Sequence, residues 1–221
     1  MAFAIIHPIR REINAQYYYI KTMINAYPSF MNDWLSREEE KNKVIAKESS
    51  DGDADVFFTT YKNLCSGMDV FYETTNSFYQ AVFLVTYSYY KSWLCKIGKE
   101  LGCNKENIDV REIREKGNLQ FENEIHEKVG YLYETVKNFR NLIAHNNNGT
   151  FKGYKKEQEE ALQNICSKYD DIKENDGCVI INGSEFINDV LEMEHEILLE
   201  ICDKLGYQTH YIKYNSNGNN S

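Results

Sequence analysis

The 221-residue sequence has few of the features that break a chain or fix it covalently. It contains two prolines, Pro8 and Pro28, so long uninterrupted helices are permitted. Its six cysteines include no Cys-x-x-Cys pair, which argues against a zinc ribbon and a thioredoxin-like motif. No apolar run approaches the ~18 residues of a membrane span, and the run that begins the chain precedes its charges, unlike a signal peptide. We therefore expect a reduced, cytoplasmic protein that makes no membrane contact.

Positive charge is also scarce. The chain has 25 Lys and Arg against 34 Asp and Glu, a formal net charge of −9. Because phosphate binding depends mainly on Lys and Arg, an acidic chain is not a general nucleic-acid coat, and any RNA contact requires a local basic patch. Hydrophobic residues at 42% and charged residues at 27% are ordinary for a globular protein. That composition excludes a disordered chain and a coiled-coil rod.

The hydrophobic pattern predicts an all-α, up-and-down helical bundle. Segment 75–101 is apolar on almost every side, which is typical of a buried central helix. The motif CVIING, 178–183, predicts a short strand or hairpin arm before the last helix. The expected helices are 8–26, 30–47 (separated from the first by Pro28), 75–101, 110–116, 121–146, 154–170 and 184–205.

Three parts of the chain differ in composition. Residues 1–50 are expected to form N-terminal helices packed on the bundle, and residues 51–207 the main helical domain. Residues 208–221 are expected to form a C-terminal tail. The tail ends in the low-complexity segment NSNGNNS, which predicts disorder from residue 215.

The helix expected at 121–146 carries the most informative motif. Its apolar stripe consists of Ile125, Val129, Leu132, Val136, Phe139 and Ile143. At 100° per residue, Asn141 and His145 point away from this stripe and lie one turn apart. Glu134 lies on the same outward face two turns earlier, and Arg140 lies on the flank. By spacing alone a structural interpretation is favoured, because a terminal His can interact with the helix dipole and an Arg stem can cover apolar surface.

The segment RNLIAH, from Arg140 to His145, resembles the signature of the HEPN (higher eukaryotes and prokaryotes nucleotide-binding) family. That signature is an Arg, a polar residue directly after it, and a His after four to six intervening residues, at the end of a bundle helix. Here the polar residue is Asn141 and four residues intervene. The resemblance covers about residues 56–205. It implies a HEPN-like bundle that forms a homodimer, with the motifs of two copies facing one cleft.

Membership of that family would imply a metal-independent endoribonuclease without cofactor, acting as a toxin or anti-phage effector on tRNA or mRNA. By the resemblance, His145 transfers protons, Arg140 holds the scissile phosphate, and Asn141 orients His145 or the phosphate. The products would carry 2′,3′-cyclic phosphate and 5′-OH ends. Glu134 and Lys137 are expected to support this site. A cognate antitoxin or other partner protein is expected. The local basic patch would come from Lys137, Lys152, Lys155 and Lys156.

Two alternatives remain open from the sequence. The acidic charge and the 17 tyrosines also suit a non-catalytic interaction module, a HEPN-like dimer that binds a partner protein or a nucleotide. The motif Glu192-x-x-His195 matches one half of a di-iron bundle site, but His126 has Asn123 in the position where the second half needs Glu. We therefore expect no metal, and a solvated face formed by Glu192, Glu194, His195 and Glu196.

Overall fold

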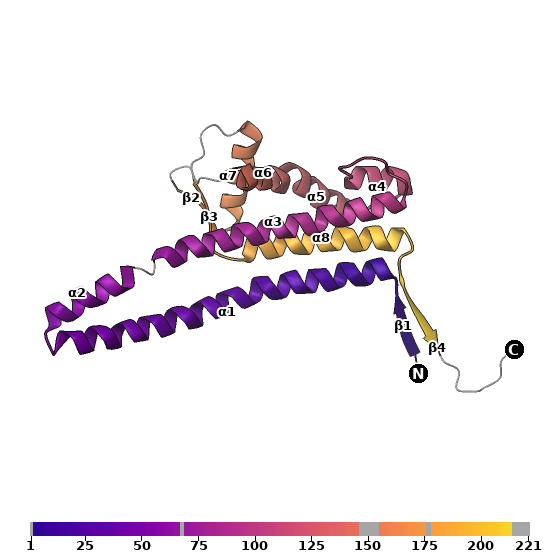
Figure 1. Cartoon of the computed structure of the whole chain (residues 1–221). Helices are drawn as coiled ribbons and strands as arrows, with labels where there is room; N and C mark the ends of the chain where they lie inside the picture. Colours follow the sequence, from indigo (N-terminus) through magenta and orange to yellow (C-terminus); the bar gives the residue numbers. More distant parts are fainter. Residues whose placement is uncertain (1, 67–68, 146–154, 176–177, 214–221) are drawn as a thin grey trace.

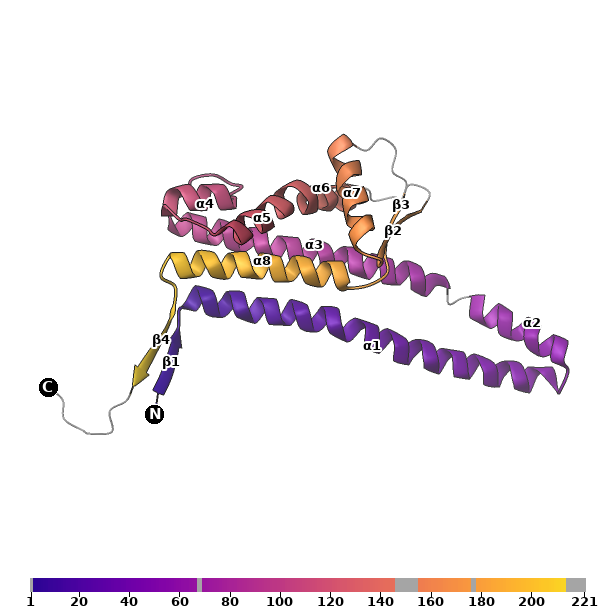
Figure 2. The same ribbon diagram turned by 180° about the vertical axis from the view of Figure 1, so that it is seen from behind.

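The computed structural model describes residues 2–66, 69–145, 155–175 and 178–213, and it confirms the predicted all-α helical bundle. Figures 1 and 2 show two long central helices, α3 and α8, running between α1 on one side and α4 to α7 on the other. No described helix is both long and apolar enough to cross a membrane. The helices are α1 (Pro8–Ser50), α2 (Ala54–Cys65), α3 (Asp69–Glu100), α4 (Val110–Gly117), α5 (Asn123–Tyr131), α6 (Lys137–His145), α7 (Lys156–Lys168) and α8 (Glu185–Lys204).

The predicted break at Pro28 is wrong, because α1 runs through this residue without interruption (Figure 1). A proline inside a helix removes one backbone hydrogen bond and crowds the carbonyl four residues earlier. Packing on both sides compensates, since Ile24 and Met31 are buried and Tyr27 stacks on Phe78 of α3 with ring centroids 3.6 Å apart. Tertiary contacts therefore override the local signal.

The second half of α1 pairs with α2 in a two-helix arm that extends beyond the bundle (Figure 1). Asp51 at φ 43° and Gly52 at φ 87° make the turn in left-handed conformations. Asp53 then caps α2, accepting hydrogen bonds from the backbone N–H groups of Asp55 and Val56 at 2.9 and 3.2 Å. No described residue of α2 is fully buried.

An aromatic cluster joins four helices at the centre of the molecule. Phe139 of α6 lies 5.4 Å from Phe83 of α3 and 5.3 Å from Phe186 of α8, measured between ring centroids. Tyr169, directly after α7, lies 5.1 Å from Phe186. All four side chains are buried. Phe139 therefore anchors α6 and fixes the direction in which the next residue, Arg140, points.

The helix predicted at 121–146 is continuous but contains a π-helical turn, η2 (Leu132–Val136), between α5 and α6. There the N–H of Lys137 donates to the carbonyl of Leu132, five residues earlier. The side chain of Asn138 donates to the carbonyl of Glu134 at 2.7 Å. Such wide turns are uncommon and recur at functional sites. The predicted helix end at 146–149 lies outside the described residues.

The predicted hairpin before the last helix is confirmed as β2 (Ile172–Asn175) paired with β3 (Cys178–Ile181). Asn76 and Gln80 of α3 bond its backbone at Ile181 N–H and Val179 C=O, at 2.9 and 3.0 Å. A second antiparallel pair, β1 (Ala2–Ile6) and β4 (Thr209–Lys213), joins the two ends of the chain (Figure 1). The sequence did not predict this pair, and it includes part of the expected C-terminal tail. Residues 214–221 lie outside the described residues.

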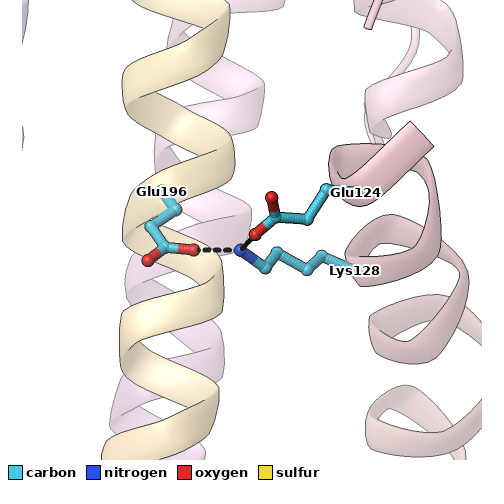
Figure 3. A network of polar contacts seen from close by, with 3 residues as sticks. All are labelled: Glu124, Lys128 and Glu196. Carbon is cyan, nitrogen blue, oxygen red and sulfur yellow. Dashed lines mark hydrogen bonds and ion pairs between the residues drawn. The ribbon is translucent and has the colours of Figure 1, made fainter. Parts of the chain in front are cut away.

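A polar contact links α5 to the central layer. Lys128 Nζ lies 2.6 Å from both Glu124 Oε1 of its own helix and Glu196 Oε2 of α8 (Figure 3). These hydrogen bonds raise the pKa of Lys128, and the one to Glu124 contributes most. The ammonium therefore stays charged, and the bridge persists, through neutral pH. It fixes the side of α5 that faces α8 and leaves the other side to the groove described next.

Candidate anion-binding groove

An open groove of about 750 Å³ lies between α3, α4 and the continuous run from α5 to α6. The lining residues on that run include His126, Gly130, Tyr133, Lys137 and Asn141. They recur every three or four residues, so they form one face of the helical run across the π turn. The groove is therefore a continuous surface along this run.

Arg140 stands in the groove wall with its guanidinium held on two sides. Its Nη1 donates to Asn141 Oδ1 at 3.2 Å, and its Cζ lies 5.8 Å from the ring centroid of Tyr87. Its Nε–H is buried and has no acceptor among the described residues. A buried donor without a partner is costly, so the site favours an acceptor brought by a ligand.

Tyr87 of α3 forms the floor beneath this guanidinium. Burial, followed by the charge of Glu194, raises the pKa of Tyr87 to about 12, and the charge of Arg140 partly opposes this shift. The phenol is therefore neutral at physiological pH. It packs against Arg140 and cannot serve as a base.

The predicted site residues separate into two groups. Arg140, Asn141, Glu134 and Lys137 all line the groove. His145 is exposed at the end of α6 and is not among the groove-lining residues. It lies one helical turn beyond Asn141 on the same side, so it stands past the end of the groove. Arg140 and His145 are five residues apart, about 140° around an α-helix, and do not converge within one chain.

Five basic side chains line the groove, namely Lys91, Arg111, Arg114, Lys137 and Arg140. Among the described residues, none of them has a carboxylate oxygen within the 4.0 Å of an ion pair. Two acidic residues, Asp109 and Glu134, also line the groove. Asp109 is engaged, because its carboxylate accepts the backbone N–H of Glu112 at 3.0 Å to cap α4. Although the whole chain is acidic, the groove is locally cationic.

The predicted basic patch differs from the observed one. Lys137 lines the groove, Lys155 and Lys156 do not, and Lys152 lies outside the described residues. Sequence reasoning missed the cations on α3 and α4. Arg111 and Arg114 were recoverable, because two arginines three residues apart on a predicted helix share a face. Lys91 offered no such signal.

The predicted solvated face at 192–196 is wrong for two of its four residues. Glu194 is fully buried, and neither carboxylate oxygen has a hydrogen-bond partner among the described residues. Burial raises the pKa of this carboxyl well above its usual range. His195 stacks on Tyr17 at 3.9 Å and lies 3.2 Å from the hydroxyl of Tyr89; burial, followed by the charge of Arg10, lowers its pKa to about 4.

The di-iron alternative has no geometric counterpart among the described residues. Glu192 pairs with Lys21 at 2.5 Å instead of approaching a ligand partner. Within the described ranges, no group of three or more His, Cys, Asp and Glu side chains is arranged to hold a metal ion. His195 and Glu192 are therefore explained by packing and ion pairing.

Comparison with known proteins gives no match. No family model matches the sequence, no curated protein resembles it, and no solved structure matches the fold. The function must therefore be inferred from the residues of the groove and from the motif that adjoins it.

Proposed function

We propose that the protein is a metal-independent endoribonuclease that binds RNA in the cationic groove. The observation that carries the proposal is a set of five basic side chains, Arg140 among them, that line one groove and have no carboxylate partner among the described residues, in a chain of net charge −9. Unpaired guanidinium and ammonium groups attract phosphate. The RNLIAH segment, with its resemblance to the HEPN signature, supplies the reason to expect cleavage in addition to binding.

Arg140 is the proposed ligand of the scissile phosphate. A guanidinium binds phosphate through two parallel N–H groups, and it keeps its charge at every accessible pH. Asn141 accepts one N–H from Arg140 and so fixes the plane of the fork. Lys137, which is partly buried, lies one turn earlier and adds positive charge near the transition state.

His145 is the proposed proton carrier. In the cleavage step the ribose 2′-oxygen forms a bond to phosphorus while the bond from phosphorus to the 5′-oxygen breaks. The 2′-OH gives its proton to a base, and the 5′-oxygen receives a proton from an acid, leaving a 2′,3′-cyclic phosphate and a 5′-OH. Attack and departure occur on opposite sides of phosphorus, so two groups are needed.

A second copy of the chain would supply the other imidazole and would bring it to the Arg140 of its neighbour. This arrangement accounts for the separation of Arg140 and His145 on one helix. The proposal therefore includes a homodimer. It also includes a toxin or anti-phage role on cytoplasmic tRNA or mRNA, restrained by a partner protein.

The test is cleavage of RNA by purified protein in excess EDTA, with analysis of the product ends. We expect 2′,3′-cyclic phosphate and 5′-OH ends, and a loss of at least 100-fold in kcat for His145→Ala. His7→Gln is the matched control, because His7 stacks on Tyr207 at 4.2 Å and is not among the groove-lining residues. Undiminished cleavage by His145→Ala would remove the imidazole from the reaction.

The second candidate is a non-catalytic interaction module, and the α1–α2 arm favours it. Phe30 and Phe58 on this arm are 65% and 66% exposed. Exposed aromatic side chains on an extended arm are typical of a protein-binding surface. Expression of wild-type and His145→Ala chains in cells distinguishes the candidates. Equal growth with both chains, together with no RNA product in vitro, supports the module.

A further inference from the structure

Helix α4 presents two arginines to the groove from a rigid support. Val110 and Ile113 are buried, and Arg111 and Arg114 on the adjoining face line the groove together with Val110. Asp109 caps the start of the helix, and Asn118, at φ 48°, ends it by donating its N–H to the carbonyls of Arg114 and Glu115. Caps at both ends hold an eight-residue helix that would be unstable alone.

The segment before α4 is fixed on α3 at the same place. Lys91 Nζ donates to the carbonyl of Ile108 at 2.9 Å, and the Ile108 side chain is fully buried. A Cβ at Gly98 would lie 2.6 Å from Ile108 Cγ2, so only glycine permits this close approach. The positions of Arg111 and Arg114 relative to Arg140 are therefore set by the fold.

Aromatic rings stand between these cations. Tyr133 is half exposed, and the ammonium of Lys137 lies 4.1 Å from its ring centroid. Phe121 and His126 meet edge to face at 6.0 Å near the other end of the groove. Aromatic side chains alternating with cations are typical of sites that stack the bases of a single strand.

The groove is long enough for several nucleotides. Its wall runs from His126 to Asn141, which spans about 22 Å at the rise of a helix. At ~3.4 Å per nucleotide of a stacked strand, that length accommodates about six nucleotides. The cations come from three helices, α3, α4 and α6, which suits a polymer of phosphates better than a single nucleotide.

We infer that Arg111 and Arg114 form a second phosphate-binding site, which holds single-stranded RNA next to the phosphate bound by Arg140, with Tyr133 stacking on a base. The inference rests on the proposed function and extends it to the substrate class. A duplex is disfavoured, because stacking on Tyr133 requires a base released from its neighbours. Arg111 and Arg114 bind the strand at a distance from the reacting atoms.

The test is a fluorescence anisotropy titration of the full-length protein with a labelled 2′-O-methyl RNA decamer. This probe lacks the 2′-OH nucleophile, so it binds without being cut. For the double variant Arg111→Gln/Arg114→Gln we expect affinity to fall at least tenfold at 100 mM salt. We also expect the slope of log affinity against log salt to fall by about 1.4, because two phosphate contacts are lost from a single strand.

The matched control is Lys99→Gln/Lys116→Gln. Lys99 lies in the last turn of α3 and Lys116 lies on α4; both are exposed, and neither lines the groove. This control removes the same charge and is expected to change affinity less than twofold. Equal losses in the two double variants would overturn the inference, as would equal affinity for the decamer annealed to its complement. Tyr133→Ala removes the ring on which a base is inferred to stack. A several-fold weaker affinity of this variant for the decamer supports the inference.

Cleavage kinetics separate this inference from the proposed function. In Arg111→Gln/Arg114→Gln, KM should rise at least tenfold while kcat stays within twofold of the wild type. If wild-type protein binds the decamer through these arginines but cuts no RNA, the proposed function fails and the binding site stands. If RNA is cut and KM is unchanged in the double variant, the proposed function stands and the binding site is wrong.

Discussion

Basic side chains on the two sides of the bundle are used in different ways. On the side of α1 and α8, Arg10 pairs with Asp203, Lys21 with Glu192 at 2.5 Å, and Lys96 with Glu12 at 2.8 Å. In the groove, the five cations have no carboxylate partner within the part of the chain that the structure describes, although acidic residues outnumber basic ones in the chain. Total charge is therefore a poor guide to what a surface binds. Positive potential remains where basic side chains are not paired with carboxylates.

The two sides also differ in what their charges contribute to the protein. Exposed ion pairs contribute little to stability, typically 0–1 kcal/mol. Unpaired cations placed near one another repel, so the groove lowers the stability of the free protein and gains from a polyanion. This difference predicts that substitutions in the groove change RNA binding and that substitutions in the paired set do not.

The largest effect is expected at Arg140. Replacing it with alanine removes the phosphate ligand and should lower kcat/KM for RNA at least 100-fold, because one lost donor to a developing charge costs that much. The measurement is initial-rate kinetics with a labelled RNA. Arg10→Ala is the control, since Arg10 pairs with Asp203 and is not among the groove-lining residues. Equal losses of kcat/KM in Arg140→Ala and Arg10→Ala would show that groove cations and paired cations do not differ in function.

A stability effect of about 1–3 kcal/mol is expected at Glu194. Its carboxyl is buried without a hydrogen-bond partner among the described residues, and Glu194→Met should raise the free energy of unfolding by removing that penalty. Chemical denaturation with urea measures this.

The same residue predicts a pH dependence of known sign. Because burial raises the pKa of Glu194 in the folded state, the native protein binds a proton that the unfolded chain releases above pH 4.5. Wild-type stability should therefore fall as pH rises above 4.5, and Glu194→Gln should lose this part of the slope. Parallel pH profiles of the two proteins between pH 4 and 8 would show that the carboxyl is not held protonated.

Two glycines test how the groove wall is positioned. Gly98→Ala places a methyl group against Ile108 and should lower the free energy of unfolding by about 1–3 kcal/mol, with weaker RNA binding because α4 is displaced. Gly130→Ala has open space around its Cβ and lies within α5, so it should raise stability by about 0.5–1 kcal/mol. Thermal and urea unfolding of both variants measure this difference. Equal effects of the two substitutions would contradict it.

The smallest effect is expected at Lys128, a cation that is paired with carboxylates. Lys128→Ala breaks the bridge to Glu124 and Glu196 shown in Figure 3 and should change the free energy of unfolding by about 1 kcal/mol or less. RNA affinity should not change, because Lys128 does not line the groove. A large loss of binding would show that the unpaired cations are not the ones that matter.

Local signals in the sequence predicted the bounds of two helices to within one residue. The short helix expected at 110–116 is observed as Val110–Gly117, and the last helix, expected at 184–205, as Glu185–Lys204. Caps and periodicity involve neighbours in sequence, so one chain suffices to find them. The break expected at Pro28 was wrong because tertiary packing holds the helix on both sides of the proline. Tyr27 stacks on Phe78 of α3, and Met31 is buried.

The features that the sequence could not reveal are those that depend on distant residues. The pairing of β1 with β4 joins the two ends of the chain. The two strands are not connected by a turn, so no local sequence pattern predicts that they pair. The burial of Glu194 follows from three-dimensional packing against α3. The groove gathers Lys91, Arg114 and Arg140 from three helices. Sequence reasoning placed Arg140 and Asn141 outside the apolar stripe but had no means to find their neighbours.

The most direct test compares two triple variants of equal charge for binding of the 2′-O-methyl decamer. One variant changes the groove cations Arg114, Lys137 and Arg140 to Gln; the other changes the paired cations Arg10, Lys21 and Lys96 to Gln. Both lose three positive charges, and circular dichroism confirms that each is folded. The account predicts that the groove variant loses binding at least 100-fold while the paired variant stays within threefold of the wild type. Equal affinities of the two variants would contradict it.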